Sequence, residues 1–423
     1  MLSRLNLFSK SKTELTLVAS NQIVDILTTL LVTKLISVYL TKGEYGFYSL
    51  ILSLLAFISI FPFNSLHSAI ERYVIEYKNK NVYEKNYISL ISIHFIFFIL
   101  YLIALFFVAP FLSIQWKSIL PLLIFFIISK IYKGLLITIL NIERKRVLIL
   151  IVRSIDMLIQ LSIIVIFIFS QILSVKHILF SSILGSFVTI LIILINERHL
   201  IRPKLLEFSA FTKVFNDILR FSFPLIFWGI FIWAQNMITR WFINFELNIT
   251  DVANYSILSS LASLPAFTLI AIIAGFIVPI AYEKENETKG YIHSISNKTQ
   301  KWHVLLWVII FIIALVFKDF LIILFLDKKY TDVSWALPYL IFGSAIYCIG
   351  QISIYEIYYY KKPKLLLLSN VVPGLFTIIT GQYMVREFGF NGAIYLHIIA
   401  NLLSGIITLT TSRYFHKHIT RYS

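Results

Sequence analysis

Long apolar blocks separated by short polar connections make up most of this chain. A helix that crosses the hydrocarbon core of a membrane needs about 20 apolar residues. By that criterion the sequence predicts twelve transmembrane helices, at residues 15–40, 47–63, 87–109, 117–139, 147–170, 175–195, 217–243, 252–280, 302–326, 335–360, 364–385 and 391–412. Pro62, Pro110, Pro203 and Pro363 fall at or near block ends, where helix breakers are expected. We therefore expect an all-α, polytopic membrane protein.

The composition supports this fold class. Hydrophobic residues make up 59% of the 423 residues and charged residues only 14%, whereas a soluble domain carries about 25% charged residues. The single cysteine, Cys348, excludes an internal disulfide and a cysteine zinc site. No other pattern indicates a metal site, so we expect none.

The basic residues are unevenly distributed over the connections. Seven connections and ends that alternate along the chain hold 25 Lys and Arg, and the others hold only six. Cytoplasmic loops are enriched in Lys and Arg, so the bias predicts that both termini are cytoplasmic and that the number of spans is even. We therefore attribute the net charge of +16 to the basic cytoplasmic loops and to some contact with anionic lipid, rather than to nucleic-acid binding. We expect a multi-pass protein of the inner (cytoplasmic) membrane.

The longest mid-chain connection, about residues 196–216, divides the predicted spans six and six. This predicts an N-terminal six-helix bundle at residues 1–205 and a C-terminal one at 206–423. The halves share a weak repeat, because residues 43–50 and 250–257 each place an acid four residues before Tyr-Ser. Six spans separate the copies, so the repeat is parallel. Parallel halves with a binding site between them are a common arrangement in transporters.

Four segments, in order along the whole chain, resemble motifs of one transporter family. They are YLTKGEYGFYS at residues 39–49, FSFPL at 221–225, LFLDKKY at 324–330 and FGFNGAI at 388–394. The chain thus resembles the oligosaccharide (O-antigen, Wzx-type) flippases of the multidrug/oligosaccharidyl-lipid/polysaccharide (MOP) exporter superfamily. It differs in having Thr239 before Arg240, where the family often has Asp, and Asn254, where it often has Gly.

The resemblance implies two six-helix bundles, with a MATE-like fold, that form a V around a central cavity. It also implies that an undecaprenyl-diphosphate-linked oligosaccharide, such as an O-antigen or capsule repeat unit, is flipped by alternating access from the inner to the outer leaflet. Expected partners are this lipid-linked oligosaccharide, membrane lipid and other polysaccharide-assembly proteins.

Ionisable residues inside the predicted spans are the candidate functional residues. A cation facing lipid near the bilayer centre costs about 3 kcal/mol, so such residues face protein or water, or reach an interface. Lys and Arg would attract an anionic lipid-diphosphate headgroup, and Arg can hold a phosphate with two hydrogen bonds. The predicted substrate-binding residues of a cationic cavity are Arg240, Lys34, Lys130, Lys133 and Arg153. Asp25 and Asp156 are candidates for coupling to a proton or sodium ion.

Structural alternatives exist for each of these charges. Lys130 and Lys133 share a helix face near the cytoplasmic end and can extend their amines to the interface. Arg153 and Asp156, three residues apart, can form an internal ion pair. Asp25 can instead neutralise a cation, and Lys34 lies on nearly the opposite face of the same helix.

Several enzyme classes lack their signatures here. The sequence has no Gly-x-x-x-x-Gly-Lys-Ser/Thr loop, no Gly-x-Ser-x-Gly and no His-Glu-x-x-His. The predicted outer loops are about ten residues or shorter, which disfavours a membrane enzyme of polysaccharide assembly. We expect neither a catalytic residue nor a cofactor. A multidrug cation antiporter of the same fold is the main alternative, although it would favour intramembrane acids over bases. A scaffold without transport activity is the last alternative.

Overall fold

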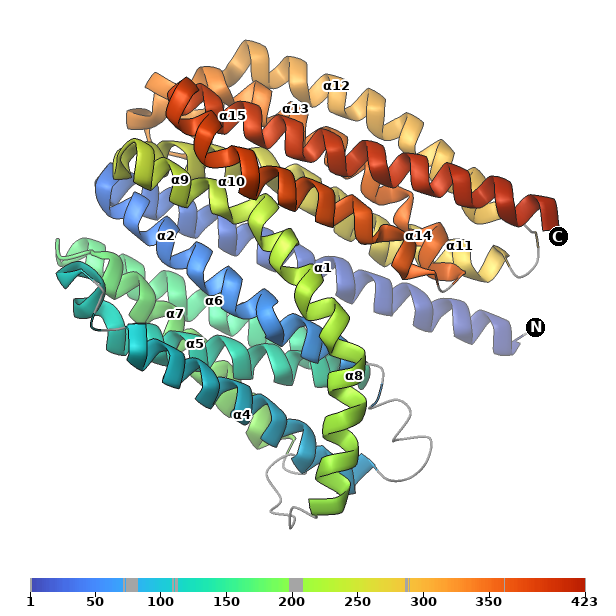
Figure 1. Cartoon of the computed structure of the whole chain (residues 1–423). Helices are drawn as coiled ribbons and strands as arrows, with labels where there is room; N and C mark the ends of the chain where they lie inside the picture. The colour runs from blue at the N-terminus through green and yellow to red at the C-terminus, as the bar shows by residue number, and fades with distance from the viewer. Residues whose placement is uncertain are drawn as a thin grey trace. The chain divides into compact units, whose positions relative to one another are not determined.

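The computed structural model describes residues 2–70, 73, 83–108, 110, 113–197, 208–285, 288, 290–360 and 362–422. Every regular element within these ranges is helical, and no strand occurs in them. The chain forms two compact units (Figure 1), which are described separately. Unit 1 contains Met1–Ser53 and Phe231–Ser423, and unit 2 contains Leu54–Ile230. The predicted boundary at residues 205 and 206 lies outside the described residues, and the two six-helix bundles stay a prediction.

Unit 2 consists of the helices between residues 54 and 196 and most of the helix that follows the mid-chain connection. Its elements are the end of α2 (Lys42–Ile58), the π-helical turn η1 (Ser59–Asn64), α4 (Tyr83–Val108), α5 (Ile114–Ile142), α6 (Arg146–Phe169), α7 (Val175–Asn196) and most of α8 (Phe208–Trp233).

Unit 1 combines the first helix with the rest of the C-terminal region. Its elements are α1 (Leu2–Tyr39), the start of α2, η4 (Ala234–Ile238), α9 (Thr239–Glu246), α10 (Ile249–Ile272), η5 (Ile273–Ile277), α11 (Val278–Glu285), α12 (Tyr291–Phe325), η6 (Lys328–Ala336), α13 (Leu337–Ile352), α14 (Ile354–Tyr359), η7 (Pro363–Leu366) and α15 (Leu367–Tyr422). Both chain ends lie at the same end of this unit (Figure 1).

The helix α15 is broken near its middle. A straight helix of its 56 residues would be about 84 Å long, far more than the roughly 30 Å of a hydrocarbon core. Gly389, with φ +57° and ψ −138°, interrupts the helix between the two spans predicted there. A Cβ atom on Gly392 would lie 2.0 Å from the carbonyl oxygen of Met384. Glycine at 392 therefore allows the chain to turn back tightly after the break, as Figure 1 shows.

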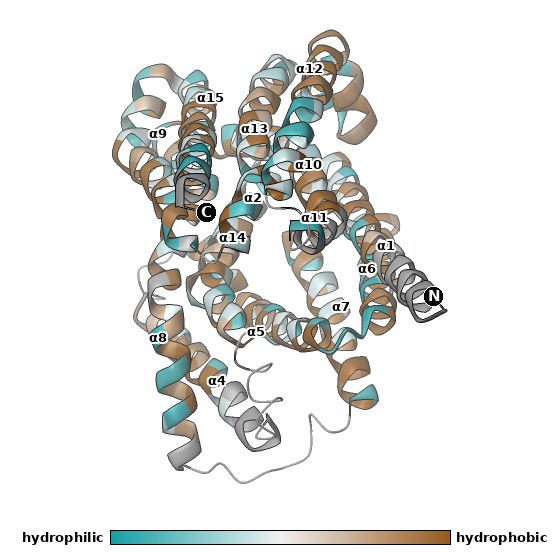
Figure 2. Cartoon of the chain, turned by 90° about the vertical axis from the view of Figure 1, so that its right-hand side faces the viewer, coloured by the Kyte–Doolittle hydropathy of each residue, from teal (hydrophilic) through white to brown (hydrophobic). Residues whose placement is uncertain are grey.

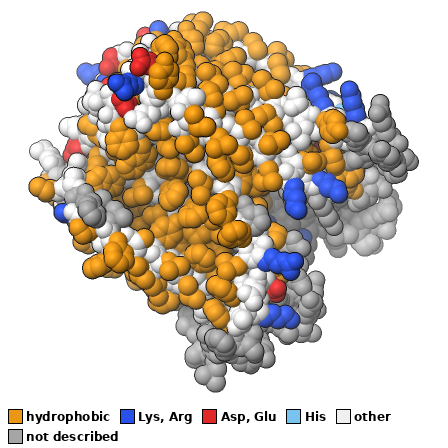
Figure 3. Space-filling model, in the orientation of Figure 1, with side chains coloured by type: hydrophobic (Ala, Val, Ile, Leu, Met, Phe, Trp, Pro, Cys, Tyr) orange, Lys and Arg blue, Asp and Glu red, His pale blue; other side chains and the backbone are white. Residues whose placement is uncertain are grey.

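The membrane character of the chain is confirmed by its helices. In the described ranges, nine helices are long and apolar enough to cross a membrane. A tenth is reached if Phe211–Phe223 and Leu225–Glu246, bent by 43°, form one span. Hydrophobic residues recur along the helices of both units (Figure 2). In the face shown in Figure 3, hydrophobic side chains dominate and charged ones gather at the margins. The count of twelve spans and the cytoplasmic side of the termini stay predictions.

Glycines allow the helices of unit 1 to pack closely. A Cβ on Gly350 of α13 would lie 2.7 Å from Gly405 Cα of α15, so these two backbones are nearly in contact. A Cβ on Gly46 would lie 2.1 Å from Ile249 O, where α10 begins. Close approach through small residues is how membrane helices gain van der Waals contact. The two copies of the sequence repeat therefore pack against each other at the starts of α2 and α10.

Candidate functional site

Arg240 of α9 is a buried cation that forms no ion pair with any acid among the described residues. Its side chain is 9% exposed. The Nε atom donates to Ser256 Oγ at 3.0 Å, and Nη1 donates to the carbonyl of Asn236 at 3.2 Å and contacts Met237 Sδ. Within the part of the chain that the structure describes, no carboxylate forms an ion pair with Arg240, and its Nη2 atom makes no hydrogen bond. A buried charge is costly unless an opposite charge compensates it, so this site suits an anion.

A chain of hydrogen bonds links helices in the interior of unit 1. It begins at Gln235, a little before Arg240 in the sequence. Gln235 Nε2 donates to Asn401 Oδ1 at 3.3 Å, and Asn401 Nδ2 lies 3.1 Å from His397 Nε2. The same ring nitrogen lies 3.2 Å from Leu340 O and 3.4 Å from Ser344 Oγ. His397 is therefore part of a hydrogen-bonded network that joins α13 and α15. Sequence reasoning did not single out Gln235 or Asn401, although amides inside apolar blocks are a usable signal.

Lys133 and Asp156 form an ion pair between α5 and α6 of unit 2. The Nζ–Oδ2 distance is 2.5 Å, and the side chains are only 18% and 13% exposed. A Cβ on Gly185 of α7 would lie 2.4 Å from Asp156 Oδ1, so glycine leaves room for this carboxylate. The structure thus pairs Asp156 with Lys133 of the neighbouring helix, whereas the sequence alternative had paired it with Arg153 of its own helix.

Lys130 and Arg153 flank this ion pair along α5 and α6. Lys130 lies one turn before Lys133, and its Nζ lies 5.2 Å from the centroid of the Phe126 ring. No described acid forms an ion pair with Lys130. Arg153 is half-buried, one turn before Asp156. Cargo binding by these residues stays a prediction, and Lys130 is the better candidate than Lys133, because the charge of Lys133 is already compensated.

Asp25 lies on an exposed face of α1 in unit 1. Its carbonyl oxygen accepts a hydrogen bond from Thr29 Oγ1 at 2.8 Å. Asn21, one turn earlier, is buried and donates to Leu17 O at 2.8 Å. The predicted role of Asp25 in ion coupling is not tested by these contacts.

Two lysines at one end of unit 1, Lys34 and Lys329, form what we term the lysine clasp. Lys34 contacts carbonyls at the end of α12, and Lys329, which follows α12, contacts carbonyls at the end of α1. Lys34 of α1 donates to Ile323 O at 2.7 Å and to Leu326 O, at the end of α12. Lys329 donates to Leu40 O, and its Nζ lies 3.4 Å from Val38 O, at the end of α1. The last carbonyls of a helix lack partners within the helix and carry partial negative charge, so they attract a lysine.

Replacement of Lys34 by methionine is expected to destabilise the protein by about 2 kcal/mol, because carbonyls at the end of α12 lose their donor. Thermal unfolding of the purified protein measures the loss. Lys42→Met is the matched control, since the Lys42–Asp332 ion pair at 2.8 Å has exposures of 22% and 58% and such pairs contribute about 1 kcal/mol or less. Equal stability of the two variants would show that the clasp does not hold α1 against α12.

Lys145 is an ion-pairing residue in the short connection between α5 and α6. Its Nζ lies 2.9 Å from Glu143 Oε2 and also contacts Glu197, which follows α7. Burial lowers the pKa of Lys145, but the hydrogen bonds and charges of Glu197 and Glu143 outweigh burial and raise it overall. Lys145, one of the basic residues in the connections, therefore also links the α5–α6 connection to the end of α7 in unit 2.

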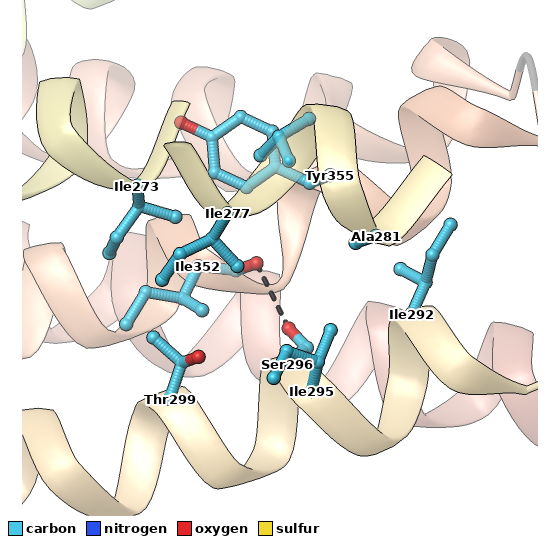
Figure 4. Close-up of a pocket in the computed structure, with 10 residues that line it drawn as sticks. Ile273, Ile277, Ala281, Ile292, Ile295, Ser296, Thr299, Ile352 and Tyr355 are labelled. Carbon is cyan, nitrogen blue, oxygen red and sulfur yellow. Dashed lines mark hydrogen bonds between the residues drawn. The ribbon is translucent and has the colours of Figure 1, made fainter. Parts of the chain in front are cut away.

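A small pocket in unit 1 has no charged lining (Figure 4). The polar side chains in its lining are the hydroxyl-bearing Ser296, Thr299 and Tyr355. Ser296 Oγ donates a hydrogen bond to Ile352 O at 3.0 Å. The lining residues are Ile273, Ile277, Val278, Ala281, Ile292, Ile295, Ser296, Thr299, Ile352 and Tyr355. Because no Lys or Arg lines it, the pocket does not match an anionic headgroup. The buried charged residues therefore stay the candidate site.

The candidate charges belong to both compact units. Unit 1 contains Asp25, Lys34 and Arg240, and unit 2 contains Lys130, Lys133, Arg153 and Asp156. Lys133 and Asp156 are brought into direct contact, and Lys34 is engaged in the clasp. A single cavity lined by all five cations stays a prediction.

Comparison with known proteins places the fold. No protein-family model and no curated protein sequence matches the chain. Among solved structures, the lipid II flippase MurJ in an inward closed conformation has a TM-score of 0.71 and 16% identity, over 96% of this chain and 87% of that one. An inward-facing multidrug resistance MATE family transporter of the MOP superfamily has a TM-score of 0.66 and 14% identity, over 97% and 96%. A mutant of the Vibrio cholerae MATE transporter VcmN has a TM-score of 0.66 and 13% identity, over 99% of both chains.

These similarities cover nearly the whole chain and show its fold. The chain is a multi-span membrane protein with a MATE-like fold. The three similar structures are of transporters or a flippase. The fold class expected from the sequence is confirmed at this level, and the particular Wzx-type branch stays a prediction.

Proposed function

We propose that this protein is a transporter that flips an undecaprenyl-diphosphate-linked oligosaccharide, an O-antigen or capsule repeat unit, from the inner to the outer leaflet of the cytoplasmic membrane. The observation that carries the proposal is the buried Arg240, whose side chain, among the described residues, hydrogen-bonds to neutral acceptors alone. The diphosphate between lipid and sugar supplies the anion that this site lacks.

The chemistry of Arg240 suits a phosphate group. Guanidinium groups bind phosphate through paired N–H donors, which adds geometric specificity to the charge attraction. Nε and Nη1 hold the side chain in place, and Nη2 has no hydrogen bond to another described residue, so it is the donor proposed to meet the phosphate. Binding through one fixed guanidinium is moderate, as transport requires, because the headgroup must also leave.

The fold supports a lipid-linked cargo. The similar MurJ structure is, by its description, of a lipid II flippase, and the four sequence segments resemble the oligosaccharide flippases. In this proposal Lys130 and Asp25 keep the roles predicted from the sequence, which are cargo binding and coupling to a proton or sodium gradient. Alternating access delivers the cargo to the outer leaflet, where other polysaccharide-assembly proteins receive it.

A multidrug cation antiporter is the second candidate function. Two of the similar structures reported above are MATE transporters, one of them described as a multidrug resistance protein. An exporter of organic cations would be expected to bury a carboxylate at its binding site. Here Arg240, a buried guanidinium that forms no ion pair with a described acid, would repel a cation, so the flippase is favoured.

The direct test is reconstitution in liposomes with a fluorescent undecaprenyl-diphosphate oligosaccharide, whose arrival in the opposite leaflet is followed with a membrane-impermeant quencher. Protein-dependent flipping supports the proposal. Efflux of cationic dyes without flipping of the host's own lipid-linked sugar would establish the antiporter instead.

Replacement of Lys130 by methionine is expected to slow flipping about tenfold, because a hydrogen bond to a charged group contributes about 1.5–3 kcal/mol. The initial rate in the liposome assay is the measurement. Lys176→Met, an exposed lysine at the start of α7, is the control and should retain the wild-type rate. If both variants flip at the wild-type rate, Lys130 does not contact the cargo.

A further inference from the structure

A second cluster of titratable side chains lies in unit 1 and has no part in the proposed transport site. It consists of His293 near the start of α12, Glu356 of α14 and His416 near the end of α15. Glu356 is only 2% exposed. His293 Nδ1 lies 3.0 Å from Glu356 Oε2, and His416 Nδ1 lies 2.8 Å from Glu356 Oε1. Two imidazole nitrogens from separate helices thus converge on one buried carboxylate.

The two imidazole rings stack face to face, with centroids 3.4 Å apart and planes at 7°. Their stacking keeps both Nδ1 atoms on the same side, towards Glu356. Ser412, one turn before His416, donates from Oγ to Glu356 Oε2 at 3.2 Å and so helps to orient the carboxylate. The fold therefore brings two imidazole nitrogens and one oriented carboxylate together.

The charge balance of the cluster favours a cation. No Lys or Arg in the described ranges forms an ion pair with Glu356, although a buried carboxylate needs a compensating charge. Glu285 lies nearby through Tyr360, whose hydroxyl donates to Glu285 Oε1 at 2.9 Å, and it adds another negative charge to this end of the unit.

The distances suit a small divalent metal ion. The three potential ligand atoms all lie within 4.8 Å of one another. Ligand atoms on a tetrahedral zinc ion are roughly 3.4 Å apart, since zinc–nitrogen and zinc–oxygen bonds are about 2.1 Å long. The observed contacts of 3.0 and 2.8 Å would need to widen by about half an ångström to accommodate that geometry. The two rings would also tilt out of their parallel stack, because each Nδ1 lone pair lies in the plane of its own ring.

We infer that His293, Glu356 and His416 form a zinc-binding site, with both Nδ1 atoms and the Glu356 carboxylate as protein ligands. Imidazole nitrogen with one carboxylate is a ligand set that zinc accepts, whereas Mg²⁺ and Ca²⁺ prefer oxygen ligands alone. The two histidines are 23% and 24% exposed, so water can reach the fourth position. The sequence analysis predicted no metal site, because these ligands are not close together along the chain.

The bound ion would join three helices that otherwise meet through hydrogen bonds. It links the start of α12, the short α14 and the last turns of α15 at the end of unit 1 that carries both chain ends (Figure 1). An ion that binds only the folded protein raises its thermal stability in proportion to the logarithm of the ion concentration over the dissociation constant. Zinc is thus expected to increase the melting temperature of the full chain.

The test uses the full-length protein in detergent, without a polyhistidine tag and stripped with a chelator. Isothermal titration with ZnCl₂ and elemental analysis after desalting should show one zinc ion per chain. His293→Asn and His416→Asn should each weaken zinc binding about tenfold or more, since even the outer partners of metal ligands matter by 10- to 100-fold. His177→Asn is the control, because His177 of α7 contacts Ser174 at 2.9 Å and lies in unit 2.

A measurement on the unaltered protein guards against variants that misfold. Co²⁺ bound to the wild type should produce the visible absorption bands of a tetrahedral nitrogen and oxygen site, and added Zn²⁺ should remove them. Failure of the wild type to bind zinc or cobalt stoichiometrically would overturn the inference, as would unchanged affinity in both folded ligand variants. Either outcome would leave the cluster as a hydrogen-bonded link between helices, and neither would bear on the flipping activity.

Discussion

Arg240→Met is expected to lose most of the flipping activity while remaining at least as stable as the wild type. Arg240 is 9% exposed and has no acidic partner among the described residues. Replacing buried ionic groups by apolar residues of similar volume is neutral or stabilising, here by about 1 kcal/mol. Loss of its bonds to a phosphate removes about 1.5–3 kcal/mol of binding, so flipping should fall about 10- to 100-fold.

Two measurements on the same preparations separate function from folding. Thermal unfolding reports stability, and the liposome assay reports the flipping rate per folded molecule. Arg240→Lys retains the charge but not the paired donors, so we expect an intermediate rate. Lys176→Met controls for the loss of a positive charge on the protein. A variant Arg240→Met that is strongly destabilised, yet flips normally when folded, would assign Arg240 a structural role.

Lys133→Met and Asp156→Leu, made singly, are each expected to destabilise the protein by about 3 kcal/mol, because each leaves the remaining charge buried without its partner. The two side chains are 18% and 13% exposed, and their charged atoms are 2.5 Å apart. The double variant should regain most of that loss, since it buries no charge at this position. Thermal or denaturant unfolding of all four proteins yields the coupling between the two residues.

The same double variant tests whether Lys133 also contacts cargo. We expect it to flip at close to the wild-type rate, because Lys133 is engaged with Asp156 and Lys130 remains in place. Additive single and double effects would contradict the buried ion pair. A stable double variant with little flipping would instead place Lys133 in the cargo path, as the sequence predicted.

The helical membrane fold was predictable from the sequence because apolar length is a local property. A span requires about 20 apolar residues wherever its neighbours lie, and the predicted block at 147–170 matches α6 at Arg146–Phe169. The four resembling segments also predicted the MATE-like fold. Three of them lie at turns or helix ends, whereas FSFPL at residues 221–225 lies within α8. Gly389, in one of these segments, breaks α15 between two predicted spans.

The candidate site was predictable only as a set of residues. An intramembrane Lys, Arg or Asp is conspicuous in any sequence, and all seven predicted charges lie in described helices. Their partners could not be read from spacing. Lys34 contacts a carbonyl 289 residues away, and Asp156 pairs with Lys133 of another helix rather than with Arg153 of its own.

The sequence by itself determined that this is a helical membrane protein with several buried cations, because hydrophobicity and charge belong to individual residues. Only the tertiary structure decided which cations are compensated. Arg240 has neutral neighbours, Lys34 caps α12, and His293 and His416 converge on Glu356. Those outcomes depend on which helix faces meet, and contacts between helices distant in sequence are set by packing of the whole unit rather than by any local pattern.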